Sequence, residues 1–330
     1  MNLRRNFVIA IGAGALVLPL RALAQQQGKV WRIGFISARS RPASLDTHYL
    51  GEFVKGMREL GYVEGKNLVI EWRFADGHYD RLPGLAAEIA GLKVDAILAA
   101  GPPVIIAAQN ASTTIPIVIV TSIDPVEAGF VKSFAHPGGN ITGISNLSGD
   151  LASKHLEMLL NMMPRLSRVA VLSNPANSAH ATTLKNVQVA ALRVNVKVLP
   201  LEARTPAQIN SAFSVITREK AGALILGLDP FFNQQVLQLA ELAAKNRLPV
   251  ISTSREFVEA GCLISYGQNL GDQYHHAAVL FAKIFKGANP GDLPVEQSTK
   301  LELIINRKTA KTLGLTIPQS LLVMADKVIE

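Results

Sequence analysis

The sequence contains a single cysteine, Cys262, among 330 residues. One cysteine excludes an intrachain disulfide framework and any zinc or iron–sulfur site built from cysteines. Charged residues are also few, at 18% of the chain, whereas hydrophobic residues make up 48%. This balance excludes a disordered chain and provides ample material for a packed core. Beyond the first two dozen residues there is no run of 18 apolar residues, so we expect no membrane span there.

Residues 1–24 have the three parts of a secretory signal. Arg4 and Arg5 precede a short apolar run, which ends in the small residues Ala-Leu-Ala at positions 22–24. We expect cleavage before Gln25 and export to the periplasm, and the paired arginines hint at the twin-arginine route. A membrane anchor is the alternative, but the apolar run is too short for it.

The chain also lacks runs of basic residues. Its formal net charge is +8, and removal of the signal, with three arginines and no acid, leaves 30 basic against 25 acidic residues. Because the lysines and arginines are scattered, the sequence does not favour a nucleic-acid partner.

Motifs for catalysis, cofactors and metals are missing as well. There is no G-x-S-x-G nucleophile elbow, and the P-loop-like stretch 61–67 has no Ser or Thr after Lys66. His275 and His276 have no third ligand at metal-binding spacing. We therefore predict no catalytic residue, no cofactor and no metal.

Short apolar segments alternate with segments of helical periodicity. The predicted strands are 32–37, 68–72, 95–100, 117–120, 168–173, 196–199, 223–226, 249–252, 261–266 and 301–305. The predicted helices are 53–60, 82–89, 184–192, 209–216, 236–244, 273–285 and 307–313. This order predicts an α/β fold with parallel sheets covered by helices on both faces.

The two halves of the chain resemble each other. Residues 121–129 (TSIDPVEAG) and 253–261 (TSREFVEAG) are identical at six of nine positions, and Asp124 matches Glu256 conservatively. Residues 32–37 and 168–173 also share a pattern. The repeat predicts two similar parallel-sheet lobes, and we expect the C-terminal part to cross back between them as a hinge of several crossovers.

Ligands of open parallel sheets bind at the carboxyl ends of the strands. The candidate ligand-binding residues at these ends are Ser37, Gly101, Ser122, Asp124, Asn174, Asp229, Ser254 and Tyr266. Structural roles are equally open for some of them. Asp124 and Asp229 each precede a proline and suit the capping of a turn, Gly101 suits a Gly-Pro-Pro loop, and Tyr266 suits the core.

Several motifs resemble one known family. They are residues 53–67 (FVKGMRELGYVEGKN), 79–83 (YDRLP), 137–143 (PGGNITG), 174–177 (NPAN) and 310–318 (AKTLGLTIP). Together they resemble the ABC-transporter substrate-binding proteins related to tryptophan and tyrosine binders, over about residues 30–330.

The resemblance implies a type I periplasmic-binding fold, in which three crossovers join two α/β lobes around a small-molecule cleft. We expect the first lobe to comprise 25–163 and 262–290, and the second 164–261 and 291–330. The resemblance also implies delivery of the solute to a membrane permease with its ATPase, and we expect a monomer.

Aromatic amino acids are among the ligands of the wider family. An α-amino acid needs an acceptor for its ammonium and donors for its carboxylate. Asp124 or Asp229 could supply the first, and Ser122 with the Gly101 N–H the second, although Pro102 removes one neighbouring donor. A sensory module for a membrane receptor and a periplasmic α/β enzyme remain the alternatives.

Overall fold

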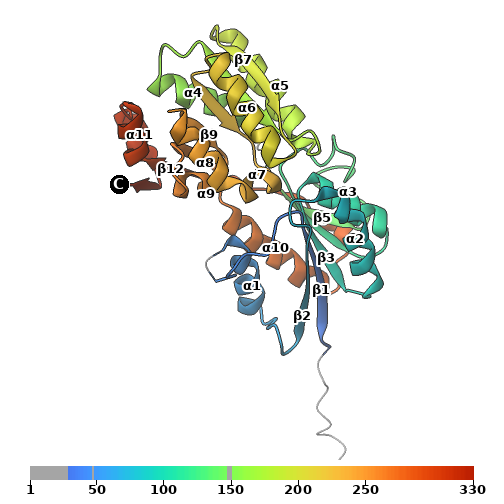
Figure 1. Cartoon of the computed structure of the whole chain (residues 1–330). Coiled ribbons are helices and arrows are strands. Elements are labelled where there is room, and N and C mark those ends of the chain that lie inside the picture. Colours follow the sequence, from blue (N-terminus) through green and yellow to red (C-terminus); the bar gives the residue numbers. More distant parts are fainter. Residues whose placement is uncertain (1–28, 47, 147–150) are drawn as a thin grey trace, which may run out of the picture.

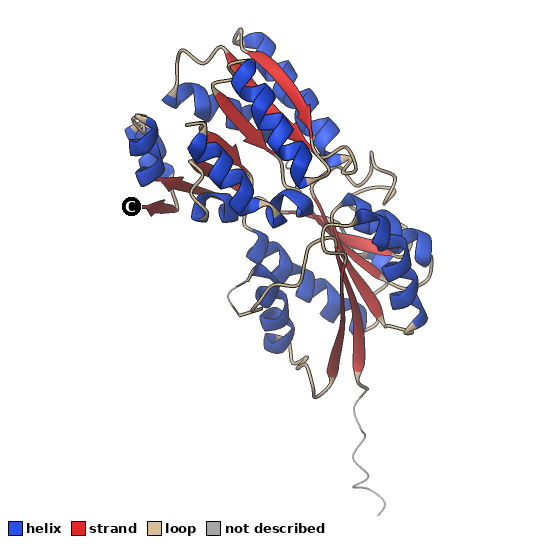
Figure 2. Cartoon of the chain, in the orientation of Figure 1, coloured by secondary structure: helices blue, strands red, loops and turns tan. Residues whose placement is uncertain are grey.

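The computed structural model describes residues 29–46, 48–146 and 151–330, so the expected signal segment lies outside the described residues. The chain forms two α/β lobes, and each lobe has one sheet between layers of helices (Figures 1 and 2). This arrangement confirms the predicted fold class. No helix within the described ranges is long and apolar enough to cross a membrane.

The first lobe holds a six-stranded sheet in the order β11-β5-β4-β3-β1-β2, with every neighbouring pair parallel. Its strands are β1 (Trp31–Ser37), β2 (Leu68–Phe74), β3 (Ala96–Ala100), β4 (Ile117–Thr121), β5 (Ile141–Ser145) and β11 (Glu296–Gln297). Its helices are α1 (Tyr49–Glu59), η1 (Tyr79–Arg81), α2 (Leu82–Gly91), α3 (Pro102–Ala111), α10 (Leu270–Phe285) and η3 (Pro290–Asp292). Helices α1 and α10 cover one face of the sheet, and α2 and α3 cover the other.

The second lobe holds a seven-stranded sheet in the order β13-β12-β10-β9-β8-β6-β7. Its strands are β6 (Arg168–Ser173), β7 (Lys197–Glu202), β8 (Ala223–Leu226), β9 (Val250–Ser252), β10 (Ile264–Gln268), β12 (Leu301–Asn306) and β13 (Lys327–Ile329). Its helices are α4 (Leu151–Met162), α5 (Ala179–Arg193), α6 (Pro206–Arg218), α7 (Pro230–Gln234), α8 (Val236–Lys245), α9 (Arg255–Glu259), α11 (Arg307–Leu313) and α12 (Gln319–Met324). Strand β12 runs antiparallel to β10, and the other pairs are parallel.

The internal repeat is visible in the strand order. The run β2-β1-β3-β4-β5 of the first sheet corresponds to β7-β6-β8-β9-β10 of the second. The repeated sequence 121–129 starts at the last residue of β4, and its partner 253–261 follows β9 directly. The same polar segments therefore leave equivalent strands at the carboxyl edge of each sheet.

The chain passes between the lobes three times, between β5 and α4, between β10 and α10, and between β11 and β12. Hydrogen bonds tie these crossovers together. The Gln268 amide donates to the Asn146 carbonyl at 2.9 Å, and its oxygen accepts from the Ser298 hydroxyl at 3.4 Å. The three connections thus form one compact hinge.

The lobe boundaries differ from those expected from the sequence. Helix α4 packs into the second lobe's core, β10 belongs to the second sheet, and β11 pairs with β5 in the first. Parts of 25–163 and 262–290 therefore lie in the second lobe, and part of 291–330 lies in the first. The reason is that each lobe completes its fifth strand before the chain crosses over.

Strand β5 depends on a glycine where it passes β4. At Gly143 a Cβ atom would lie 2.1 Å from the Ile119 carbonyl oxygen, and φ is 153°. Gly143→Ala should therefore cost about 3 kcal/mol or more of the free energy of unfolding, measured by chemical denaturation.

Gly84→Ala is the matched control for that substitution. Gly84 lies in α2, and a Cβ atom there would meet nothing within 4 Å. We expect a gain of roughly 0.5–1 kcal/mol from the better helix former. Equal effects of the two substitutions would contradict the packing described for β5.

Candidate functional site

The two lobes face each other across the carboxyl ends of their sheets. A cavity of about 890 Å³ lies between α1 and α10 of the first lobe and α9 and β10 of the second. Two smaller cavities, of about 540 Å³ and 450 Å³, lie on the side of α3 and also draw residues from both lobes. The candidate functional site is this cleft between the lobes.

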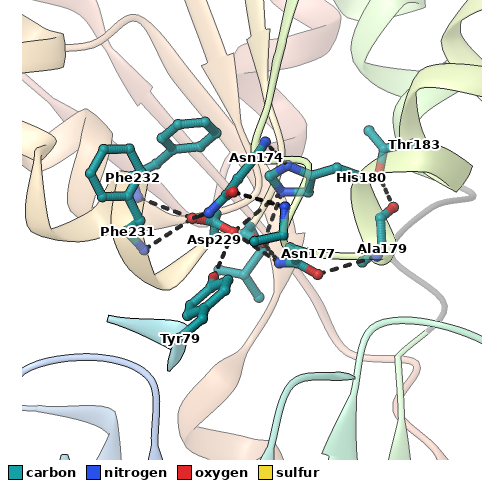
Figure 3. Close-up of polar contacts among 11 residues, drawn as sticks. Tyr79, Asn174, Asn177, Ala179, His180, Thr183, Asp229, Phe231 and Phe232 are labelled. Atoms are coloured by element: carbon teal, nitrogen blue, oxygen red, sulfur yellow. Dashed lines mark hydrogen bonds and ion pairs between the residues drawn. The ribbon is translucent and has the colours of Figure 1, made fainter. Parts of the chain in front are cut away.

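Asp229 organises a set of polar contacts where the two lobes meet (Figure 3). Its side chain has no exposed surface, and it caps α7 by accepting hydrogen bonds from the N–H groups of Phe231 and Phe232. The amides of Asn174 and Asn177 donate to it at 3.2 and 2.9 Å. A fully buried carboxylate needs such a set of donors, because burial removes its water.

The fifth donor to Asp229 comes from the other lobe. The hydroxyl of Tyr79, in η1, donates to Oδ2 at 2.9 Å (Figure 3). With five donors around it, the Asp229 carboxylate has no room for a ligand ammonium in this arrangement. In this structure it supports α7 and bonds the lobes together, which matches the capping role that the sequence left open beside ligand binding.

A second polar contact crosses the cleft between Arg39 and Glu256. Arg39 follows β1 and is oriented by Ser37, whose hydroxyl accepts from the Arg39 N–H at 3.1 Å. The Arg39 Nη1 lies 2.9 and 3.2 Å from the two carboxylate oxygens of Glu256, in α9. Asn233 donates both to Glu256 and, at 3.1 Å, to the hydroxyl of Ser254.

The Arg39–Glu256 pair stays charged. Burial works against the charge of Glu256, but Arg39 and the Asn233 hydrogen bond hold the pKa of Glu256 below its ordinary value. Burial likewise opposes the charge of Arg39, yet Tyr49 and Glu256 raise its pKa. Nearby, burial and Arg39 lower the pKa of His48 to about 4, so His48 is neutral at physiological pH.

The other predicted residues lie apart from these contacts. Ser122 and Asp124 line the 540 Å³ cavity together, and Asp124 caps its own turn by accepting from the N–H groups of Val126 and Glu127. The Gly101 N–H donates to the Val120 carbonyl at 2.8 Å and is not available to a ligand carboxylate.

Tyr266 belongs to the packing of the second lobe. Its ring meets His155 edge-on and packs against the core of α4, and its carbonyl is 2.7 Å from the His155 Nε2. These surroundings of Tyr266 match the core role that the sequence left open for it.

Sequence reasoning assigned no site role to Arg39, Tyr79, Glu256 or Asn233. Glu256 could have been found, because it is the repeat counterpart of Asp124, which was selected. Tyr79 opens one of the motifs behind the family resemblance. Arg39 and Asn233 carry no signal of that kind. In the described part of the chain, no group of three or more His, Cys, Asp or Glu residues could hold a metal ion.

Comparison with known proteins identifies the family. The model for ABC transporter substrate-binding proteins matches residues 34–329. The chain belongs to this family. A similar curated relative is a tyrosine-binding protein of Clostridioides difficile, which is 30% identical to this substrate-binding protein over 82% of this chain and 78% of the relative.

Solved structures agree with the fold. A conserved domain protein of Vibrio cholerae is 28% identical, with a TM-score of 0.84, over 91% of this substrate-binding protein and all of that chain. A domain of Streptococcus pneumoniae in complex with L-Trp has a TM-score of 0.80 over 91% of this chain and 99% of its own, and at 23% identity it supports the fold alone.

The two capping aspartates give a matched pair of substitutions. In this substrate-binding protein Asp229→Asn should cost about 3 kcal/mol of the free energy of unfolding, because an amide cannot accept from five buried donors. Asp124→Asn should cost about 1 kcal/mol or less, since asparagine caps a turn nearly as well. Equal losses in urea unfolding would contradict the difference in burial between the two sites.

Acid should destabilise the second lobe through His155. Burial lowers the pKa of His155 to about 4, against 6.5 in an unfolded chain. Above pH 6.5 the neutral, buried His155 contributes roughly 3 kcal/mol to the free energy of unfolding. This contribution is lost as the pH falls through about 4. His155→Gln should remove this part of the pH dependence of unfolding, whereas exposed His136→Gln should not. If the free energy of unfolding of His155→Gln depended on pH as it does in the unaltered chain, His155 would not be the source of this acid sensitivity.

Proposed function

We propose that this chain is a soluble periplasmic component of an ABC importer. It captures a small molecule between its lobes and delivers it to a membrane permease. The observation that carries the proposal is the cleft, where a cavity of about 890 Å³ has walls from two lobes and the lobes share one compact hinge. Such a cavity is large enough for a ligand of amino-acid or sugar size.

The proposed solute is an amino acid, with aromatic side chains favoured. Support comes from the tyrosine-binding relative at 30% identity and from the aromatic side chains of Tyr49 and His48 on the wall of the larger cavity. The proposal includes no catalytic step, because binding and release suffice for transport.

The predicted residues take two kinds of role in this proposal. Ser254, in the larger cavity, and Ser122 with Asp124, in a smaller one, are candidates for direct contact with a solute. Ser37, Asn174 and Asp229 position neighbouring groups, as their hydrogen bonds suggest. Gly101 and Tyr266 bond within their own lobes.

Thermal melting against a solute panel tests the function. The chain is exported with its own signal in a bacterial host, recovered from the periplasm, and refolded to remove bound molecules. It is then melted with amino acids, organic acids, nucleosides and sugars. A solute at 100 times its Kd should add about 2.7 kcal/mol and raise Tm by several degrees.

Two results would overturn the proposal. One is the absence of any shift across the panel, and the other is recovery of a chemically altered solute by mass spectrometry. Retention of the chain in the cytoplasm of the host would contradict the proposed location.

A further inference from the structure

We propose that Arg39 and Glu256 form the recognition site for the charged head of an α-amino acid, with Arg39 binding the carboxylate and Glu256 the ammonium. The inference rests on the proposed function and names the solute class. Neither residue was selected from the sequence, and neither is assigned a role by the comparisons.

Arg39 and Glu256 come from opposite sides of the cleft. Arg39 belongs to the first lobe and Glu256 to the second, and both follow strand ends at the cleft. A solute bound at this point of the cleft would therefore contact both lobes. In this structure each side chain bonds the other, at 2.9 and 3.2 Å, so each already has the partner charge that a solute would have to replace.

The charges of this pair are complementary to those of an α-amino acid. An α-amino acid carries its ammonium and its carboxylate on one carbon atom, so its protein partners must be opposite charges placed side by side. Arg39 and Glu256 meet this requirement. The Arg39 guanidinium bonds Glu256 through Nη1, and Nε and Nη2 are the donors that the proposal assigns to the solute carboxylate.

Polar side chains surround Glu256 in the second lobe. Asn233 is buried and donates to both Glu256 and Ser254, and its own Oδ1 has no hydrogen-bond partner among the described residues. The Asn233 amide uses one lone pair of the Ser254 hydroxyl and leaves that oxygen able to take a further bond. Ser254 and Glu256 both line the 890 Å³ cavity, so these two side chains face a space of ligand size.

The surroundings of the pair narrow the solute class. Tyr49 and neutral His48 line the cavity beside Glu256, and the Arg39 guanidinium lies 5.2 Å from the Tyr49 ring centre. The cavity is also lined by six carboxylate side chains and only two of Lys or Arg. It should accept neutral or cationic amino acids with aromatic side chains and repel acidic ones.

The test removes one charge of the solute at a time. Calorimetry measures the binding of L-tyrosine, of tyramine, which has no carboxylate, and of 3-(4-hydroxyphenyl)propionate, which has no ammonium. L-Tyrosine should bind at least about tenfold more tightly than either analogue, since each loses a charge-assisted hydrogen bond. Tyramine or the propionate binding as tightly as tyrosine would overturn the assignment without any variant.

Substitutions then assign each charge to a residue. Arg39→Gln should weaken the affinity for tyrosine at least about tenfold and change the affinity for tyramine less than about threefold. Glu256→Gln should weaken the affinity for tyrosine by a similar factor and leave the affinity for the propionate nearly unchanged. Arg73→Gln and Glu88→Gln break an ion pair of 2.8 Å within the first lobe and should change none of the three affinities. Circular dichroism confirms that each variant is folded.

The remaining outcomes separate this inference from the proposed function. If Arg39→Gln and Glu256→Gln weaken all three molecules alike, the pair only holds the lobes together and the assignment fails. If a sugar or nucleoside binds and no amino acid does, the assignment fails and the binding function stands. If no molecule of the panel binds, the proposed function itself fails.

Discussion

A carboxylate without contact to water must obtain all its hydrogen bonds from protein, and Asp229 obtains them from three separate parts of the chain. Its own helix supplies two N–H groups, the segment after β6 supplies two amides, and Tyr79 reaches it from the other lobe. These demands fix the loops at the carboxyl edge of the second sheet. They also give the first lobe a defined contact with that edge.

The internal repeat explains how the two edges came to differ. Equivalent strands β4 and β9 are followed by nearly the same sequence, but the acid of the first copy, Asp124, caps its own turn. The acid of the second copy, Glu256, crosses the cleft to Arg39. Glu256 has one more methylene group than Asp124, and the Asn233 amide beside it donates to its carboxylate. These two differences distinguish the contact between the lobes from the local cap. The similar segments therefore serve different physical purposes.

Much of the fold could be predicted from the sequence, because buried parallel strands are short apolar runs with clear ends. The sequence also predicted the two-lobe repeat. It missed strand β5, whose Ile-Thr-Gly-Ile-Ser pattern is weakly apolar, and helix α3, because Gly101-Pro102-Pro103 suggested a loop. Prolines are tolerated in the first turn of a helix, and these two open α3.

The site was harder to predict than the fold. Strand ends indicated the edge of each sheet that faces the cleft, yet which side chain crosses the cleft depends on how the lobes meet. Tyr79, Arg39 and Glu256 gain their partners 150 or more residues away. No local pattern encodes such a pairing, and an acid such as Asp229 looks the same in sequence whether its oxygens face solvent or five buried donors.

The most direct test of whether the contacts across the cleft hold the lobes together is the distance between the lobes, measured by electron paramagnetic resonance. Spin labels at Lys66→Cys and Lys245→Cys, both exposed and in different lobes, report the separation, and Cys262 is too buried to react. The labelled chain that keeps Arg39 and Tyr79 should give one narrow distribution of distances between the two labels. Combining Arg39→Gln with Tyr79→Phe should broaden it toward longer distances. Superimposable distributions would show that these contacts do not hold the lobes together.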